Sequence, residues 1–334
     1  MSTPPAARPR GDRLRLGLIG AGWIMPAHLA ALDRLGRTEV VGVASARLTS
    51  AQATAGARGA TAYDDIERML DEQHPDVVYV AVPPSASVAA CLAVAQRGIP
   101  FLAEKPLAAT DSEGPARVAA EVAERGLVAA VGYHLRALEQ LPEVRRRLGD
   151  NPARLVTGHW MDGTPAPAWW LREAVGGGQV VEQATHLYDL ARTLVGEATV
   201  VGAASYRDDP VVPEGADVVD ATSAVIRFES GAVGSFANTR RLATHVVDIS
   251  FTSDGLLTTI RRTSPDPGRW EVTFHDGRSI LTRPPGRDPY EHQAEVFLDA
   301  VEAGDPAAVL STYADAVLTD RLTRAVVAAT GRPG

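Results

Sequence analysis

Residues 17–25 read Gly17-Leu18-Ile19-Gly20-Ala21-Gly22-Trp23-Ile24-Met25 and join an apolar stretch, residues 14–20, to a predicted helix, residues 26–35. In a loop of this kind Gly20 makes the tight turn and Gly22 lets a pyrophosphate approach the backbone closely. The helix that follows offers free N–H groups and the positive end of its dipole to the phosphates. The loop therefore predicts a dinucleotide site.

Met25 stands where the G-x-G-x-x-G fingerprint has its third glycine, so we expect the helix to sit slightly further from the strand. The glycines alone are weak evidence, and their place between a strand and a helix carries the prediction. The loop residues expected against the cofactor are Gly20, Ala21, Gly22, Trp23 and Ile24.

Apolar strands alternate with helices from this loop to residue 131. The predicted strands are 14–20, 40–44, 77–82, 101–103 and 127–131, and the predicted helices are 26–35, 64–72 (capped by Asp64), 85–97 and 111–125. Alternation of this kind predicts a doubly wound parallel sheet with helices on both faces. We assign residues 1–134 to an NAD(P)-binding Rossmann domain in an α/β protein.

The pattern changes after residue 147. One predicted strand, 154–160, and one long predicted helix, 180–195, are followed by predicted strands at 199–206, 221–228, 232–239, 246–252, 256–260 and 270–274. The chain closes with predicted helices at 291–303 and 313–330. Strands in succession favour a largely antiparallel, open-faced sheet. We assign residues 135–334 to a C-terminal α+β domain for substrate binding and oligomerisation.

Composition excludes several classes of protein. The formal net charge of the 334 residues is -8, which disfavours nucleic-acid binding. The single cysteine, Cys91, allows no internal disulfide and is expected to be a buried helical thiol. Neither a signal-peptide core nor a membrane span is apparent, so we expect a cytoplasmic protein, no membrane partner and a frayed tail over residues 1–13.

The end of the second strand bears on the choice of cofactor. It reads Val43-Ala44-Ser45-Ala46-Arg47, without the acid that usually binds the ribose of NAD. Ser45 and Arg47 could instead hold a 2′-phosphate. The sequence favours NADP over NAD, although NAD stays open because an exposed arginine at a strand end is common.

Two further motifs carry a family resemblance. Ala103-Glu104-Lys105-Pro106 follows a strand, and Gly176-Gly177-Gly178-Gln179-Val180-Val181-Glu182-Gln183-Ala184-Thr185-His186-Leu187-Tyr188-Asp189 leads into the long helix. In this order and spacing, the chain resembles the Gfo/Idh/MocA oxidoreductases, the family of glucose-fructose oxidoreductase and inositol 2-dehydrogenase. The resemblance extends to the closing helices around Phe297-Leu298-Asp299-Ala300. Many members have Asp at the position of Glu182, and many NAD users have Asp at the position of Ser45.

The resemblance implies an NAD(P)-dependent enzyme acting on CH–OH groups, with Lys105, Glu182 and His186 as its catalytic residues. Lys105 follows a parallel strand, where ligands bind, and its ammonium could polarise a carbonyl or hold an alkoxide. Glu182 and His186 are four residues apart and share a helix face. His186 is the natural proton acceptor, while Glu182 orients a hydroxyl or the histidine, or is itself the base. A metal site is not predicted.

The expected substrate is a sugar, inositol or related polyol. Aromatic faces beside polar groups suit such rings. The residues expected to bind the substrate are Lys105, Trp160, Trp169, Trp170, Arg172, Glu182 and His186. Alternatively, the tryptophans anchor a loop that packs on the core. Further residues expected against the cofactor are Val82, Pro83, Ser87, Glu104 and Lys105. No partner is apparent for His28, His74, His134 or His245, which are expected to be structural or solvated. We also expect the Lys105–Pro106 bond to be cis.

Two other functions stay open: an NAD-dependent lyase or glycosidase that oxidises its substrate transiently, and a non-catalytic NAD(P)-binding sensor. Apolar residues left over on the second sheet favour a homodimer or homotetramer. They are Val218, Val225, Ile226, Val246 and Ile249.

Overall fold

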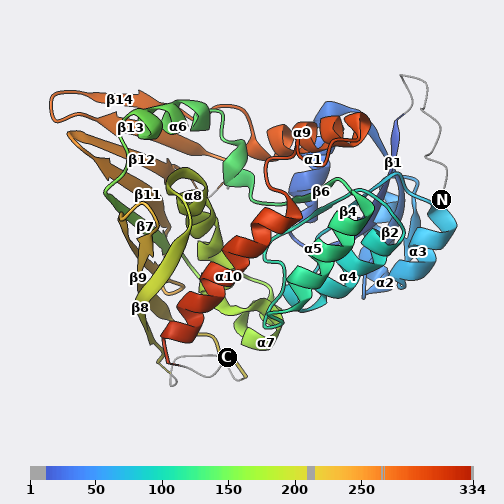
Figure 1. Cartoon of the computed structure of the whole chain (residues 1–334). Helices are drawn as coiled ribbons and strands as arrows, with labels where there is room; N and C mark the ends of the chain where they lie inside the picture. Colours follow the sequence, from blue (N-terminus) through green and yellow to red (C-terminus); the bar gives the residue numbers. More distant parts are fainter. Residues whose placement is uncertain (1–12, 209–214, 265, 267, 332–334) are drawn as a thin grey trace.

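The computed structural model describes residues 13–208, 215–264, 266 and 268–331. Two parts lie side by side, each built on one β-sheet (Figure 1). Of the N-terminal tail expected over residues 1–13, all but the last residue lies outside the described residues. Over the described ranges no helix combines the length and the apolar character needed to cross a membrane.

The first sheet, sheet A, has six parallel strands within the described chain, in the order β3-β2-β1-β4-β5-β6. Its strands are β1 (Leu14–Ile19), β2 (Thr38–Ala44), β3 (Thr61–Tyr63), β4 (Val77–Val80), β5 (Phe101–Ala103) and β6 (Ala129–Val131). The strand order reverses between β1 and β4. In such a sheet, ligands bind outside the carboxyl ends of the strands at this point.

Helices cover both faces of sheet A, as the alternating pattern predicts. One face packs against α1 (Met25–Leu35), α2 (Leu48–Gly56) and α9 (Pro289–Ala303). The other packs against α3 (Ile66–Gln73), α4 (Pro84–Gln96), α5 (Gly114–Arg125) and the first turns of α10 (Tyr313–Ala329). Cys91 of α4 is fully buried, and burial raises the pKa of its thiol to about 12.

Three details of this part differ from the sequence-based expectations. Helix α2 and strand β3 were not predicted; α2 buries only the small side chains of Ala51 and Ala55, which leave little hydrophobic periodicity. Helix α3 begins at Ile66, and its cap is Asp65, not Asp64. The reason is a hydrogen bond from the Arg68 backbone N–H to the Asp65 carboxylate, at 2.9 Å.

The second sheet, sheet B, has the order β14-β13-β12-β11-β7-β10-β9-β8 in the described chain. Only the β7–β10 pair is parallel. Its strands are β7 (Leu155–Met161), β8 (Ala198–Tyr206), β9 (Ala221–Phe228), β10 (Val233–Thr239), β11 (Val246–Ser253), β12 (Leu256–Arg262), β13 (Trp270–His275) and β14 (Ile280–Arg283). The mostly antiparallel sheet agrees with the prediction.

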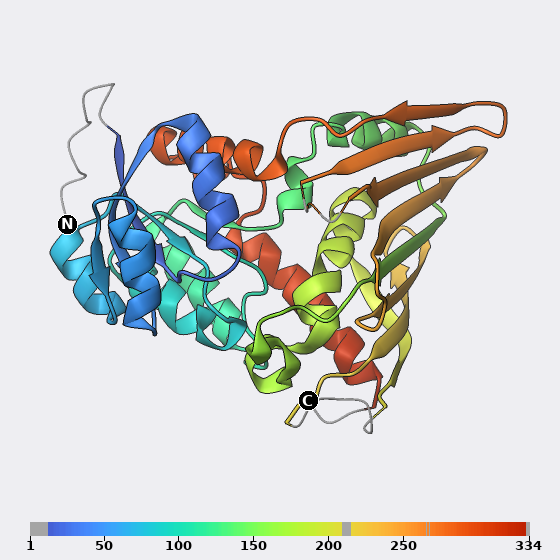
Figure 2. The ribbon, with the colours of Figure 1, turned by 180° about the vertical axis from the view of Figure 1, so that it is seen from behind.

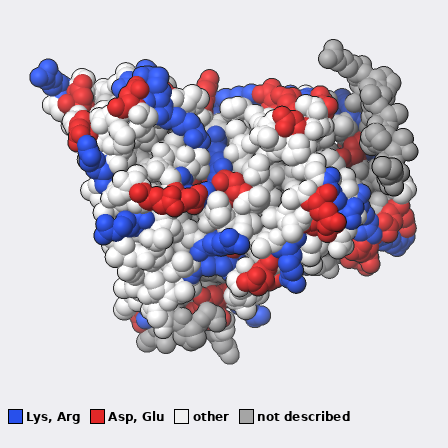
Figure 3. All heavy atoms as spheres, viewed as in Figure 1, with Lys and Arg blue, Asp and Glu red and all other residues white. Residues whose placement is uncertain are grey.

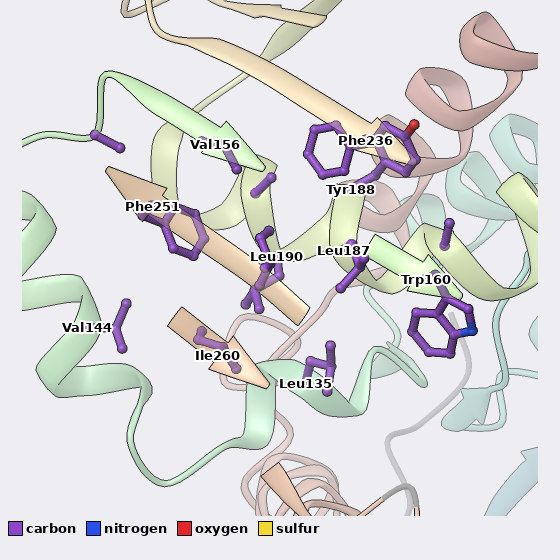
Figure 4. Close-up of a cluster of buried hydrophobic side chains, with 14 of the residues drawn as sticks. Leu135, Val144, Val156, Trp160, Leu187, Tyr188, Leu190, Phe236, Phe251 and Ile260 are labelled. Atoms are coloured by element: carbon purple, nitrogen blue, oxygen red, sulfur yellow. The ribbon is translucent and has the colours of Figure 1, made fainter. Parts of the chain in front are cut away.

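One face of sheet B packs against α6 (Leu141–Asp150) and α8 (Thr185–Val195). Figure 4 shows Leu187 and Leu190 of α8 among the side chains of Val156, Phe251 and Ile260. The other face exposes apolar side chains at Leu155, Val201, Tyr206, Val225, Val246 and Leu257. On the side of the molecule drawn in Figure 3, acidic and basic side chains are interspersed.

The expected set of leftover apolar residues on sheet B was partly wrong. Val225 and Val246 are exposed on the open face, whereas Val218, Ile226 and Ile249 are fully buried. The side chains of Ile226 and Ile249 point into the core and alternate with exposed neighbours along β9 and with half-buried neighbours along β11. Because successive side chains of a strand point to opposite faces of the sheet, apolar residues of one strand can lie on both faces. Composition alone does not show which of them are exposed.

The last two helices connect the parts. Phe297 and Leu298 of α9 complete the core beneath α1. Helix α10 buries Tyr313 against sheet A and Leu322 and Val326 in the core of sheet B (Figures 1 and 2). The predicted boundary between residues 134 and 135 stays a prediction, since the C-terminal segment contributes to both cores.

Candidate active site

The glycine loop has the geometry that a pyrophosphate requires. Gly20 has a φ of +98°, and a Cβ there would lie 2.1 Å from the carbonyl oxygen of Ala81. A Cβ on Gly22 would meet nothing within 4 Å, so this side of the loop is open. Helix α1 begins directly after this loop without a side-chain cap, so the positive end of its dipole faces the loop. The residues present fit a dinucleotide cofactor.

Met25 explains the missing third glycine. Its side chain is 1% exposed and packs in the core with Leu16, Leu18 and Leu29. The helix start is thus fixed by apolar burial. Trp23, by contrast, is 61% exposed at the edge of the loop.

The other residues expected against the cofactor have varied environments. Ser45 follows β2 and is half-buried, and Arg47 is exposed at the start of α2. Val82 and Pro83 follow β4 at the same edge of sheet A. Ser87 is buried on α4, with its hydroxyl oxygen 3.9 Å from the Cys91 sulfur.

Lys105 and Glu182 meet between the two parts of the molecule. Lys105 follows β5, and its bond to Pro106 is cis, as expected. The Lys105 Nζ donates to Glu182 Oε1 at 2.8 Å and to the Glu182 carbonyl oxygen at 2.7 Å. The second carboxylate oxygen, Oε2, accepts from the indole N–H of Trp170 at 2.7 Å. All three side chains are largely shielded from solvent.

The helix that carries Glu182 is not uniform, which corrects the prediction of one helix over residues 180–195. Residues Val180–Ala184 form a π-helical turn, and α8 proper begins at Thr185. Single π turns occur often at functional sites. Gly177 leads into this turn with a φ of +80°, and a Cβ there would lie 3.0 Å from the Ala109 carbonyl oxygen.

His186 is buried among aromatic rings. The Trp160 ring is stacked on it, with ring centroids 5.6 Å apart, and the His134 ring meets it edge-on at 4.5 Å. Burial, with further contributions from His134, Lys105 and Arg262, holds the pKa of His186 well below its ordinary value. The imidazole is therefore neutral at pH 7, and its Nδ1 atom is buried without a hydrogen-bond partner.

Two histidines that we expected to be structural or solvated lie in this cluster. His28 of α1 is hydrogen-bonded to Glu104, with 2.7 Å between Nε2 and Oε1. His134 follows β6 and is stacked on Tyr290 of α9, with ring centroids 4.8 Å apart. His134 follows a strand at the carboxyl edge of sheet A, and this position was the signal that could have identified it.

The remaining predicted substrate residues have different surroundings. Trp160, at the end of β7, is part of the His186 cluster. Trp169 is half-buried and faces Gly176, and Arg172 is exposed at the start of α7 (Glu173–Gly176). One residue was missed: Arg262, at the end of β12, lies 5.8 Å from the Trp160 ring and donates to Asp162 at 2.7 Å. Nothing in the local sequence around Arg262 indicated it.

A buried ion pair supports the helix that carries His186, and an arginine supports the loop after Lys105. Arg136 donates to both carboxylate oxygens of Asp189, one turn beyond His186, at 2.7 and 2.5 Å. Arg324 of α10 donates to the carbonyl oxygens of Ala108 and Ala109, both at 2.9 Å, in the loop after Lys105. In the described part of the chain no group of three or more His, Cys, Asp or Glu residues is arranged to hold a metal ion.

Comparison with known proteins agrees with this geometry. Residues 14–133 match the model described as "Oxidoreductase family, NAD-binding Rossmann fold", and residues 148–261 match the GFO/IDH/MocA C-terminal domain. The rhizopine catabolism protein MocA of Rhizobium meliloti is 29% identical over 320 residues, which cover 92% of each chain. Inositol 2-dehydrogenase of Rhizobium meliloti is 27% identical over 306 residues, 87% of this chain and 89% of the relative.

Two solved structures share the fold. A 3-ketoreductase from Actinomadura kijaniata in complex with NADP has a TM-score of 0.83 at 21% identity and covers 95% of this chain and 98% of its own. A levoglucosan dehydrogenase in complex with NADH and levoglucosan also has a TM-score of 0.83, at 22% identity, with 96% and 98% covered. With both domain models of one family matched in order, this chain belongs to the Gfo/Idh/MocA oxidoreductases and is an NAD(P)-dependent enzyme acting on CH–OH groups.

Proposed function

We propose that this enzyme transfers a hydride between a nicotinamide and a ring alcohol or ketone of a sugar, inositol or related polyol. One observation carries the proposal: Lys105 from the carboxyl edge of sheet A is bonded to Glu182 from the other part of the molecule. A buried neutral His186 lies on the same helical segment. The relatives named inositol 2-dehydrogenase and D-glucoside 3-dehydrogenase support the substrate class.

We assign a different role in the reaction to each residue of the site. When bound, the nicotinamide supplies the hydride chemistry. In the oxidation direction, the Lys105 ammonium binds the substrate oxygen and stabilises its developing charge. His186, neutral because it is buried, accepts the hydroxyl proton. Glu182 holds Lys105, and Trp160 with Trp169 and Arg172 lines the sugar side of the site.

The same proposal favours NADP over NAD. No acidic side chain follows β2, where Ser45 is half-buried and Arg47 is exposed. Helix α2 begins at Leu48 without a side-chain cap, so its first N–H groups face the same corner as these two side chains. A 2′-phosphate there would meet a hydroxyl, a guanidinium and a helix N-terminus, all of which suit an anion.

A substrate screen tests the proposal. Polyols, neutral sugars and sugar acids are offered with each oxidised cofactor, and the absorbance of NADH or NADPH is followed. We expect net reduction of the cofactor with at least one cyclic polyol or sugar. Product formed without net reduction would instead favour a lyase or glycosidase with transient oxidation. Cofactor binding with no conversion of any member of the panel in either direction would contradict the proposal.

The open face of sheet B suggests how copies of the chain assemble. Its exposed apolar residues, Val225, Val246 and Leu257 among them, extend over several strands. We propose that this face forms the contact of a cytoplasmic homodimer or homotetramer. Sedimentation at micromolar concentration tests this, and a monomer would contradict it. We also keep residues 1–134 and 135–334 as the proposed domains.

A further inference from the structure

We infer that Trp170 is a positioning residue for the reaction: its indole N–H fixes the Glu182 carboxylate, which in turn fixes the Lys105 ammonium. The inference rests on the proposed function and deepens it. Trp170 lies in a short 3₁₀ turn, Ala168–Leu171, and is 1% exposed. With its indole directed at Glu182, this side chain has a different role from a stacking surface for the substrate.

Both oxygens of the Glu182 carboxylate are engaged by different donors. Oε1 accepts from Lys105 at 2.8 Å and Oε2 accepts from Trp170 at 2.7 Å. A carboxylate with a donor on each oxygen has one orientation, and hydrogen bonds to an ionised group are the stronger kind. Lys105 is further held by the Glu182 carbonyl oxygen. The position of the Lys105 Nζ therefore follows from that of Glu182, and the position of Glu182 depends on Trp170.

The surroundings make this arrangement rigid. A Cβ on Gly176 would lie 3.3 Å from the Trp169 ring and 3.4 Å from the Trp170 carbonyl oxygen, so the glycine run packs directly against the tryptophan turn. The Cβ of any residue replacing Gly177 would lie 2.9 Å from the Val181 side chain. The tryptophan turn, the glycine run and the π turn thus form one packed block around Glu182.

The arrangement also separates the roles of Glu182 and His186. Both oxygens of Glu182 accept from N–H groups of Lys105 and Trp170, and neither of these donors can accept a hydrogen bond in return. His186, by contrast, is neutral. In this proposal Glu182 holds Lys105, and the substrate proton passes to His186.

A double-mutant cycle tests the inference, with single-turnover hydride transfer as the readout. Trp170→Phe removes the indole N–H and keeps an aromatic ring. We expect hydride transfer to slow about tenfold, the size of one hydrogen bond to a charged group, while the cofactor dissociation constant changes less than about twofold. In the Glu182→Gln background the same substitution should change the rate less than about twofold, because its partner charge is gone.

The matched control is Trp270→Phe, which removes a buried indole from the core of sheet B. This control measures how much thermal stability is lost when a buried tryptophan is replaced. We expect the hydride transfer rate of Trp270→Phe to equal that of the parent. Multiplicative losses in Trp170→Phe and Glu182→Gln would overturn the inference, since they would show that Trp170 acts independently of Glu182.

Glu182→Asp gives a second arm that keeps the charge and leaves Trp170 in place. The carboxylate is one methylene shorter and cannot meet both donors, so we expect a loss of about tenfold in hydride transfer. A parental rate in Glu182→Asp would overturn the inference even if Trp170→Phe does not fold. If the parent converts no substrate, the proposed function fails first. If the parent is active and the losses are independent, only the positioning role fails.

Discussion

The two halves of the site are built in opposite ways. The proposed cofactor half consists of backbone and side chains at the edge of sheet A, with Gly22 and Arg47 exposed and Ser45 half-buried. The proposed proton-handling half consists of the largely buried side chains of Lys105, Glu182 and His186, held by partners from other elements of the chain. The first is a surface that a ligand completes, and the second is complete without one. Substitutions in the two halves should therefore have separable effects.

The largest expected effects are on the rate of hydride transfer in variants of Lys105 and His186. Lys105→Ala removes the charge at the substrate oxygen and should slow hydride transfer about 10² to 10³-fold. His186→Ala removes the proton acceptor and should cost about 10² to 10⁴-fold. Cofactor affinity should change little in His186→Ala, because its helix lies in the second part of the chain. Stopped-flow kinetics with a true substrate measures this, and parental rates in His186→Ala across the neutral pH range would refute its role.

Two glycines in the cofactor half should respond differently to the same substitution. Gly20→Ala places a Cβ 2.1 Å from a carbonyl oxygen at a positive φ, so it should lower the free energy of unfolding by about 3 kcal/mol. Gly22→Ala meets open space and should leave stability within about 0.5 kcal/mol. It should nevertheless weaken cofactor binding, since the new methyl group occupies the side open to the pyrophosphate.

Urea unfolding and cofactor titration of both variants distinguish these outcomes. Equal loss of stability in the two variants would mean that Gly22 is needed for folding and not for a ligand. An unchanged affinity of Gly22→Ala for the cofactor would show that the pyrophosphate does not bind against this loop.

Ser45→Asp tests which cofactor the proposed cofactor half prefers. The parent should bind NADPH more tightly than NADH, and the new carboxylate should reverse this order by repelling a 2′-phosphate and accepting from a ribose hydroxyl. A change of about 10 to 10² in the ratio of dissociation constants is expected for a charge-assisted contact. Fluorescence titration measures both constants. Equal affinities of the parent for NADH and NADPH would count against the proposed preference.

The smallest expected effect concerns pH and belongs to the buried half. Burial holds the pKa of His186 below its ordinary 6.5, so below that pH the unfolded chain binds a proton that the folded chain does not. The free energy of unfolding should fall as pH drops below this value, by at most about 1.4 kcal/mol per pH unit from this group. Above it, His186 is neutral in both states and adds no slope.

Urea unfolding of the parent and of His186→Asn at several pH values tests this. The variant should have a shallower loss of stability toward acid. Identical slopes would show that His186 is protonated in the folded protein.

Local patterns predicted the strand, the glycine loop and the helix that begin sheet A, but only part of the contacts around Lys105, Glu182 and His186. The loop at Gly20 and the strands of both sheets other than β3 and β14 follow from short-range spacing of apolar and turn residues. The bond from Trp170 to Glu182 does not, because a tryptophan in a loop carries the same local signal whether it stacks on a sugar or donates to a carboxylate. Arg262 and Tyr290 reach the His186 cluster from elements that the sequence leaves unplaced. Their partners depend on how β12 and α9 pack.

Helix α10 has a consequence for how the chain is made. Tyr313 closes one face of sheet A, Phe297 of α9 closes the other, and Leu322 and Val326 finish the core of sheet B. A ribosome synthesises these segments after all the strands of both sheets, so both faces of sheet A stay incompletely covered until α9 and α10 have emerged. The domain that is synthesised first therefore cannot complete its core until segments that are synthesised later have packed against it. The nascent N-terminal domain should therefore expose part of its apolar surface and depend on chaperones until α9 and α10 have been synthesised.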